Sequence, residues 1–119
     1  MHYSLELNPR PFEAIKLGTK KIECRVPTEH NKDISFDKMK KGDTIRFINN
    51  VNGETLRVLV LGVKHYLSFR DLLESEGTKR VLSSGGNIEE GIVRLESFPG
   101  YKEEVRKYGV YAIEIKVID

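Results

Sequence analysis

The sequence contains no tryptophan, only one cysteine, Cys24, and no apolar run that approaches the roughly 18 residues of a membrane-spanning helix. A single cysteine excludes an intramolecular disulfide, which favours a reducing compartment, and we expect a cytoplasmic protein without a membrane partner. The start at Met1 shows no basic segment followed by an apolar one, so the sequence predicts no signal peptide.

Neither sign of charge dominates the chain. Its 20 basic and 18 acidic residues leave a formal net charge of +2 with neutral histidines. This balance does not by itself indicate a nucleic-acid-binding protein. A basic surface has to come from a local cluster, and the N-terminal segment offers one in Arg10, Lys16, Lys20, Lys21 and Arg25.

Ligand patterns for metals and nucleoside triphosphates are also missing. His2, His30 and His65 lie far apart, and Cys24 has no ligand-like neighbour, so we expect no metal site. The loop Ser83–Gly86 is not followed by Gly-Lys-Ser/Thr, which argues against a P-loop. We expect no cofactor, and the alternation of Cys24 with apolar neighbours favours a buried structural thiol over a nucleophile.

Five segments alternate between apolar and polar residues, as half-buried strands do. The segment from Thr55 to Tyr66 is apolar on both faces, which predicts a long central strand, and Gly62 marks a bulge within it. On the strand that follows Lys20, the alternation predicts that Lys21, Glu23 and Arg25 share one exposed face. The expected strands are 2–7, 20–26, 44–49, 55–66 and 109–119.

Helix signals fall between these strands. Asn8 before Pro9 starts a short helix that Gly18 ends, and Ser68 with Asp71 starts a second. Two further helices are expected after Asn87 and from Tyr101 to Gly109. Because strands and helices do not alternate regularly, we predict one α+β domain over residues 1–119 with a mostly antiparallel sheet. Closure into a small barrel would remove exposed strand edges.

Several motifs carry a resemblance to a known family. The segment GTKKIECR, residues 18–25, resembles the G-x-K-x-x-E-x-R signature of ASCH domains. KKGDTIRF at 40–47, YLSFRDLLESEG at 66–77 and the closing FPGY and YGVYAIEI segments resemble further family features in the same order. The resemblance implies a PUA-like mixed or antiparallel β-barrel of five to six strands flanked by short helices. It also implies a cleft beside the signature strand and an association with RNA or nucleotides.

The same resemblance suggests catalytic candidates. Some bacterial ASCH proteins are amidohydrolases that deacetylate N4-acetylcytidine with a lysine, a threonine and a glutamate. Lys20 matches that lysine, and Glu76 is the match for the glutamate. The threonine position holds Glu23, so the chain departs from the amidohydrolase pattern at this residue.

The residues themselves allow binding or catalysis. Glu23 and Arg25 lie two apart on one strand, about 6.6 Å from each other, and can pair either as a surface ion pair or beside a ligand. Arg25 offers a planar fork to phosphate. Lys20 has the opposite strand parity and joins them only where the chain after Gly18 is irregular; there it would act as a phosphate contact or as a base.

Three interpretations therefore stay open. The leading one is a module that binds RNA or a nucleotide through Lys20, Lys21, Arg25 and Arg10. Tyr66, Phe69 and Tyr101 are among the aromatic residues that either stack on bases or fill the core. The second is a hydrolase that acts on modified nucleosides or RNA in the same cleft. The third is a module that binds a protein partner, which the near-neutral net charge favours.

Overall fold

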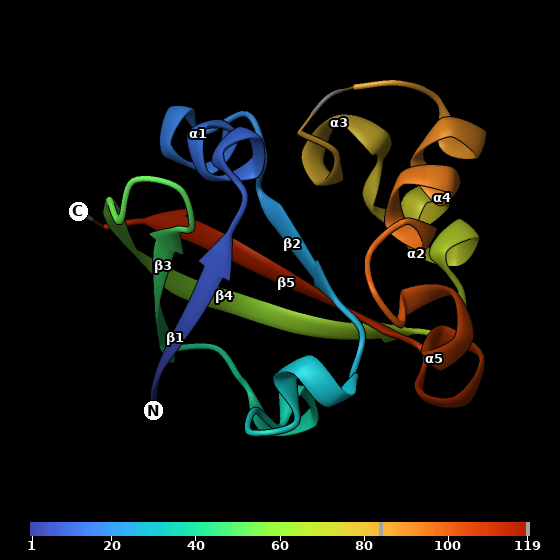
Figure 1. Ribbon diagram of the computed structural model, residues 1–119, viewed down its shortest axis with the longest axis horizontal. Helices are drawn as coiled ribbons and strands as arrows, with labels where there is room; N and C mark the ends of the chain where they lie inside the picture. The colour runs from blue at the N-terminus through green and yellow to red at the C-terminus, as the bar shows by residue number, and fades with distance from the viewer. Residues whose placement is uncertain (84, 119) are drawn as a thin grey trace.

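The computed structural model describes residues 1–83 and 85–118. Ser84, in the predicted loop, and Asp119, at the end of the last predicted strand, lie outside the described residues. Five strands form one sheet in the order β1-β3-β4-β5-β2 (Figure 1). Their bounds are β1 His2–Leu7, β2 Ile22–Arg25, β3 Thr44–Asn49, β4 Thr55–Tyr66 and β5 Val110–Val117.

The sheet is mixed, because β1 runs parallel to β3 while the other three neighbouring pairs are antiparallel. This confirms the predicted α+β class and the five strands that share one curved sheet. The strands β1 and β2 are the two edges, and no backbone ladder joins them within the described residues. The sheet is therefore a half-barrel, and we call the gap between β1 and β2 the seam.

The long strand β4 occupies the centre, as its apolar residues on both faces predict. Its register against β5 shifts between Val60 and Gly62, so the predicted bulge is present. A bulge bends the strand and increases its twist, and this lets the second half of β4 follow β5 towards the helices.

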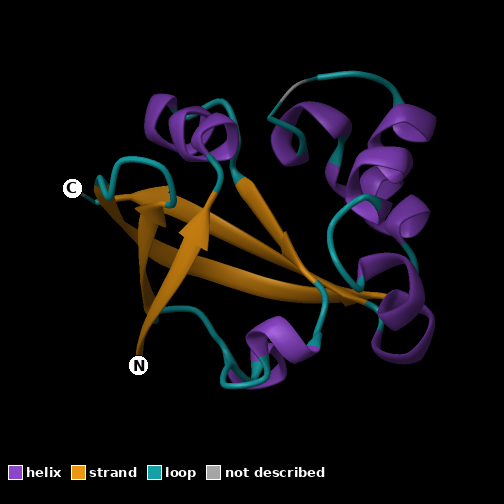
Figure 2. Cartoon of the chain, viewed as in Figure 1, coloured by secondary structure: helices purple, strands orange, loops and turns teal. Residues whose placement is uncertain are grey.

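The helices are α1 Pro9–Leu17, α2 Phe69–Glu76, α3 Thr78–Val81, α4 Ile88–Glu96 and α5 Tyr101–Tyr108, with 3-10 turns η1 Glu29–Asn31 and η2 Phe36–Lys38. The last four α-helices gather at one end of the sheet, while α1 lies over the other (Figures 1 and 2). The predicted caps at Ser68 and Asn87 are confirmed. The side chain of Asn8 instead bonds Asn50, so it places α1 beside the turn after β3.

Two apolar cores lie on opposite sides of β5. Ile113 and Ile115 pack with residues of β1, β3, β4 and α1 inside the half-barrel. Val110 and Ala112 pack with β2 and the helices α2 to α5 on the other side. The first half of β5 is therefore buried on both faces, because the helices cover its second face. The predicted half-buried alternation holds in the second half, where Ile115 is buried and Lys116 is exposed.

Within the described residues, no helix is long and apolar enough to cross a membrane.

Candidate functional site

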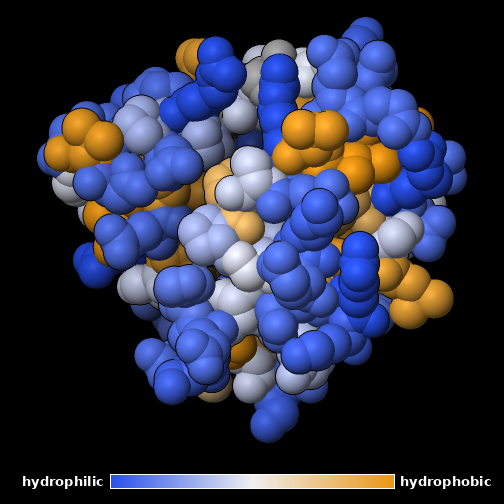
Figure 3. Space-filling model, turned by 45° about the vertical axis from the view of Figure 1, so that its right-hand side comes forward, coloured by the Kyte–Doolittle hydropathy of each residue, from blue (hydrophilic) through white to orange (hydrophobic). Residues whose placement is uncertain are grey.

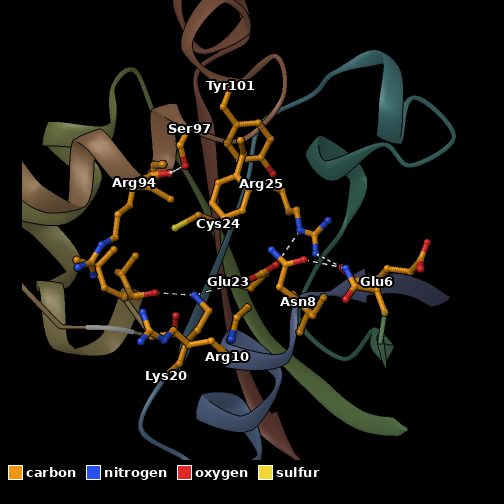
Figure 4. A pocket seen from close by; sticks show the side chains of 18 residues that line it. Glu6, Asn8, Arg10, Lys20, Glu23, Cys24, Arg25, Arg94, Ser97 and Tyr101 are labelled. Atoms are coloured by element: carbon orange, nitrogen blue, oxygen red, sulfur yellow. Dashed lines mark hydrogen bonds and ion pairs between the residues drawn. The ribbon is translucent and has the colours of Figure 1, made fainter. Parts of the chain in front are cut away.

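A cavity of about 460 Å³ lies at the seam. Its walls come from the end of β1 and the start of α1, from β2 with the residue Lys20 ahead of it, and from the helical segment between Val81 and Tyr101 (Figure 4). We call it the seam pocket. Its walls join segments that are far apart in sequence, from Glu6 to Tyr101, and both edges of the sheet border it.

Lys20 reaches the pocket because the chain is irregular between α1 and β2. Gly18 adopts a left-handed conformation, with φ of 85°, and the backbone N–H groups of Thr19 and Lys20 both bond the carbonyl of Ala14. The ammonium of Lys20 is buried, with 7% of the residue exposed. It donates to the carbonyls of Ile22 at 2.6 Å and Val81 at 2.5 Å.

The carboxylate of Glu23 lies between two cations. Its Oε1 is 3.5 Å from Nζ of Lys20, and its Oε2 accepts a hydrogen bond of 2.7 Å from Nε of Arg25. The pattern of the strand predicts an exposed Glu23, and this is wrong, since only 5% of the residue is exposed. Glu23 is paired with Ile113 across β2 and β5, so it lies on the half-barrel side of the sheet, where Lys20 and Arg25 enclose its carboxylate. Lys21 stays exposed.

Arg25 bridges the seam. Its Nη2 donates to the backbone carbonyl of Glu6 on β1 at 3.0 Å, so one side chain connects the two sheet edges (Figure 4). Burial disfavours the charge on Arg25, but the charge and hydrogen bond of Glu23, together with the nearby Tyr101 and Cys24, outweigh this effect, and the pKa of Arg25 is raised. The guanidinium therefore remains a fixed positive charge inside the pocket.

Two further groups in the wall keep their protons at neutral pH. Burial raises the pKa of Cys24 to about 12, and the nearby Lys20 charge only partly opposes this. Burial likewise raises the pKa of Tyr101 to about 12, against the opposing charge of Arg25. Neither is an anionic nucleophile at pH 7, and the predicted buried thiol at Cys24 is confirmed.

The pocket carries excess positive charge. Its basic residues are Arg10, Lys20, Arg25 and Arg94, and its acidic residues are Glu6 and Glu23, so its formal charge is +2. Nη1 of Arg94 donates to the carbonyl of Gly85, across the loop that leads into α4. Among the described residues Arg10 has no hydrogen-bonding or ionic partner, so its guanidinium is available to a ligand.

Four of the residues singled out from the sequence lie elsewhere. Glu76 is buried, accepts a hydrogen bond from the hydroxyl of Tyr66 and lies 3.5 Å from Arg80, outside the pocket lining. Phe69, the first residue of α2, is a core residue whose ring stacks on that of Tyr101. Lys21 lines a separate shallow groove beside α1 and β5. The structure thus brings together Lys20, Glu23, Arg25 and Arg10, and leaves Lys21, Tyr66, Phe69 and Glu76 apart from them.

Two aromatic residues line the pocket, Tyr101, which is a stacking candidate from the sequence, and Phe98, which the sequence does not single out. Their rings lie 5.4 Å apart between centroids and are tilted by 52°. Both belong to the FPGY segment, whose spacing in the sequence does not indicate that it lies at the same pocket as β2. Arg94, on α4, was missed for the same reason. Within the described ranges, no group of three or more histidine, cysteine, aspartate or glutamate side chains could hold a metal ion.

The mixed half-barrel, with its helices at one end and a basic pocket at the seam, defines an α+β protein consistent with a PUA-like barrel. The chain belongs to the ASCH domain family, whose model matches residues 5–119. The family is generally associated with RNA binding. The predicted resemblance is therefore confirmed over essentially the whole chain.

Solved structures agree with this assignment. Protein PF0455 from Pyrococcus furiosus is 41% identical, with a TM-score of 0.73, and the match covers 100% of this chain and 99% of that one. Hypothetical protein PH0355 is 39% identical, with a TM-score of 0.81, over 99% of this chain and 100% of that one. Protein EF3133 from Enterococcus faecalis V583 shares the fold at 11% identity, with a TM-score of 0.66 over 98% of this chain and 76% of that one. Among curated proteins, none matches the chain.

Proposed function

We propose that the protein binds RNA or a nucleotide in the seam pocket. The observation that carries the proposal is the buried chain of charges formed by Lys20, Glu23 and Arg25, beside Arg10, which has no partner within residues 1–83 and 85–118 and lines the same cavity. Buried charged groups are costly unless they are paired, and they concentrate at functional sites. The excess positive charge suits a phosphate-bearing ligand, and the family's association with RNA agrees with this.

The contacts favour binding over hydrolysis. The three N–H donors of the Lys20 ammonium face two carbonyls and a carboxylate, and a neutral amine would have one donor fewer for them. Cys24 and Tyr101 stay protonated, and Glu76 lies outside the pocket lining. No described residue of the pocket combines an activated nucleophile with an adjacent free base, which nucleophilic catalysis requires.

Fluorescence anisotropy with a labelled single-stranded RNA tests the proposal. Affinity should fall as salt rises, with a slope of about 0.7 per phosphate contact. Arg10→Ala and Arg25→Ala should both weaken binding and flatten this slope. Arg46→Ala is the matched control, because Arg46 is exposed on β3 and outside the pocket lining.

Arg10→Ala is the cleaner variant, because Arg25 also bridges the seam and its loss can alter the fold. Circular dichroism and a thermal melt check each variant before binding is measured. Absence of RNA binding at low salt, or binding that ignores both arginines, would contradict the proposal and favour a role in binding a protein partner.

A further inference from the structure

One wall of the seam pocket is an aromatic surface with an open face. Phe98 lines the cavity and is 39% exposed, a large value for a phenylalanine in contact with other rings. Tyr101 supports it from one side, and Tyr101 itself packs on the buried Phe69 at 6.4 Å between ring centroids. The ring of Phe98 is thus backed by that of Tyr101, while part of Phe98 remains exposed to a ligand.

The buried end of the pocket offers hydrogen-bond acceptors. A carboxylate has about four acceptor positions, and Glu23 uses one for Nε of Arg25 and one for the more distant Lys20. The remaining positions are open to donors from a ligand. Exocyclic amino groups and ring N–H groups of nucleobases supply such donors on an edge of a flat ring.

The free charge of the pocket lies with Arg10, at the start of α1. Lys20 and Arg25 already have carboxylate and carbonyl partners, and Arg94 holds the carbonyl of Gly85. Arg10 has no partner among the described residues and is exposed. An arginine fork in this state suits the oxygens of a phosphate group. Figure 4 shows Arg10 next to Lys20, on the same side of the pocket.

From these features we infer that the seam pocket takes one nucleotide unit at a time. The base packs against Phe98 and donates to Glu23, and its phosphate binds Arg10. The cavity of about 460 Å³ is within the range of sites for single small molecules, which runs from about 300 to 1,000 Å³. Apolar residues are also exposed among hydrophilic ones on the helical side of the molecule (Figure 3). The inference rests on the proposed function, and it narrows the ligand from an RNA strand to a single nucleoside monophosphate unit, free or within RNA.

Equilibrium dialysis tests this with the four ribonucleoside 5′-monophosphates, the matching nucleosides and ribose 5-phosphate. At least one monophosphate should bind more tightly than its nucleoside and than ribose 5-phosphate. Phe98→Ala should weaken binding of that monophosphate about 5- to 150-fold, since stacking on an aromatic side chain contributes roughly 1–3 kcal/mol per base. The same substitution should leave the affinity for ribose 5-phosphate unchanged. Tyr108→Ala is the control, as Tyr108 is exposed and outside the pocket lining.

Arg10→Ala should have the complementary effect. The monophosphate should bind more tightly than its nucleoside by about three- to tenfold, the contribution of one exposed charge-assisted contact, and Arg10→Ala should remove most of this difference. The affinity for the nucleoside should stay the same. Arg46→Ala should preserve the difference. Competition then separates the two sources of the nucleotide. A free monophosphate should displace labelled RNA completely if both use the pocket.

The outcomes distinguish the two proposals. If RNA binds in an Arg10-dependent way but no monophosphate binds or competes, the single-nucleotide inference fails and the proposed function stands. The single-nucleotide inference also fails, and the proposed function stands, if Phe98→Ala changes the affinity for the monophosphate no more than Tyr108→Ala does. If neither RNA nor any monophosphate binds, both proposals fail.

Discussion

Replacing Lys20 by methionine keeps most of the length of the buried side chain but removes its ammonium group. The carbonyls of Ile22 and Val81 then lose a donor, and Glu23 loses one of its two cations. A buried polar group left unsatisfied costs about 1–3 kcal/mol, and breaking a buried charge pair costs about 3–5 kcal/mol. Because these two costs overlap in one network, we expect Lys20→Met to lower the free energy of unfolding by about 3–5 kcal/mol.

The neighbouring lysine provides the control. Lys21 is exposed, and only its backbone groups bond other residues, so Lys21→Met should change the free energy of unfolding by less than about 0.5 kcal/mol. Urea titrations followed by circular dichroism measure both variants. With a slope of about 2 kcal/mol per molar urea, a loss of 3 kcal/mol moves the midpoint by about 1.5 M. Equal midpoints for the two variants would refute the buried donor role of Lys20.

Three other outcomes are expected. Ile113→Ala should cost about 2–5 kcal/mol in a denaturant titration, because Ile113 is fully buried in the core of the half-barrel, whereas the exposed Ile118→Ala should cost little. Burial raises the pKa values of Cys24 and Tyr101 to about 12, so the unfolded chain loses these protons at lower pH than the folded chain does. The free energy of unfolding should therefore fall as pH rises from about 9 to 12. Cys24→Ala should reduce this fall, and an unchanged pH profile in that variant would contradict the reasoning. The purified protein should show little or no hydrolysis of N4-acetylcytidine by chromatography, and efficient turnover that Lys20→Ala abolishes would favour the enzyme interpretation.

The sequence predicts local features better than it predicts the site. Alternation located all five strands, and the bulge at Gly62 followed from a glycine inside an apolar run. These features depend on neighbouring residues. The burial of Glu23 depends instead on the curvature of the whole sheet, which puts Glu23 on the half-barrel side opposite Ile113, with Lys20 and Arg25 against its carboxylate. Strand parity alone therefore predicts an exposed face.

The candidate site was predicted in part, again for physical reasons. Lys20, Glu23 and Arg25 share one short segment, and the turn at Gly18 brings Lys20 to the other two. The position of Glu76 depends on how α2 packs, which sequence spacing does not determine. The same is true of Phe98, whose approach to β2 is set by contacts among helices.

The seam has a thermodynamic consequence. β1 and β2 are held near each other by the side chain of Arg25, so a molecule that contacts both edges meets its complete binding surface only in the folded chain. Such a molecule stabilises the folded chain for as long as it is bound. Its binding adds RT ln(1 + [L]/Kd) to the free energy of unfolding, about 2.7 kcal/mol at a hundredfold excess over Kd. Melting temperature thus reports occupancy of the pocket directly, without a label on either partner.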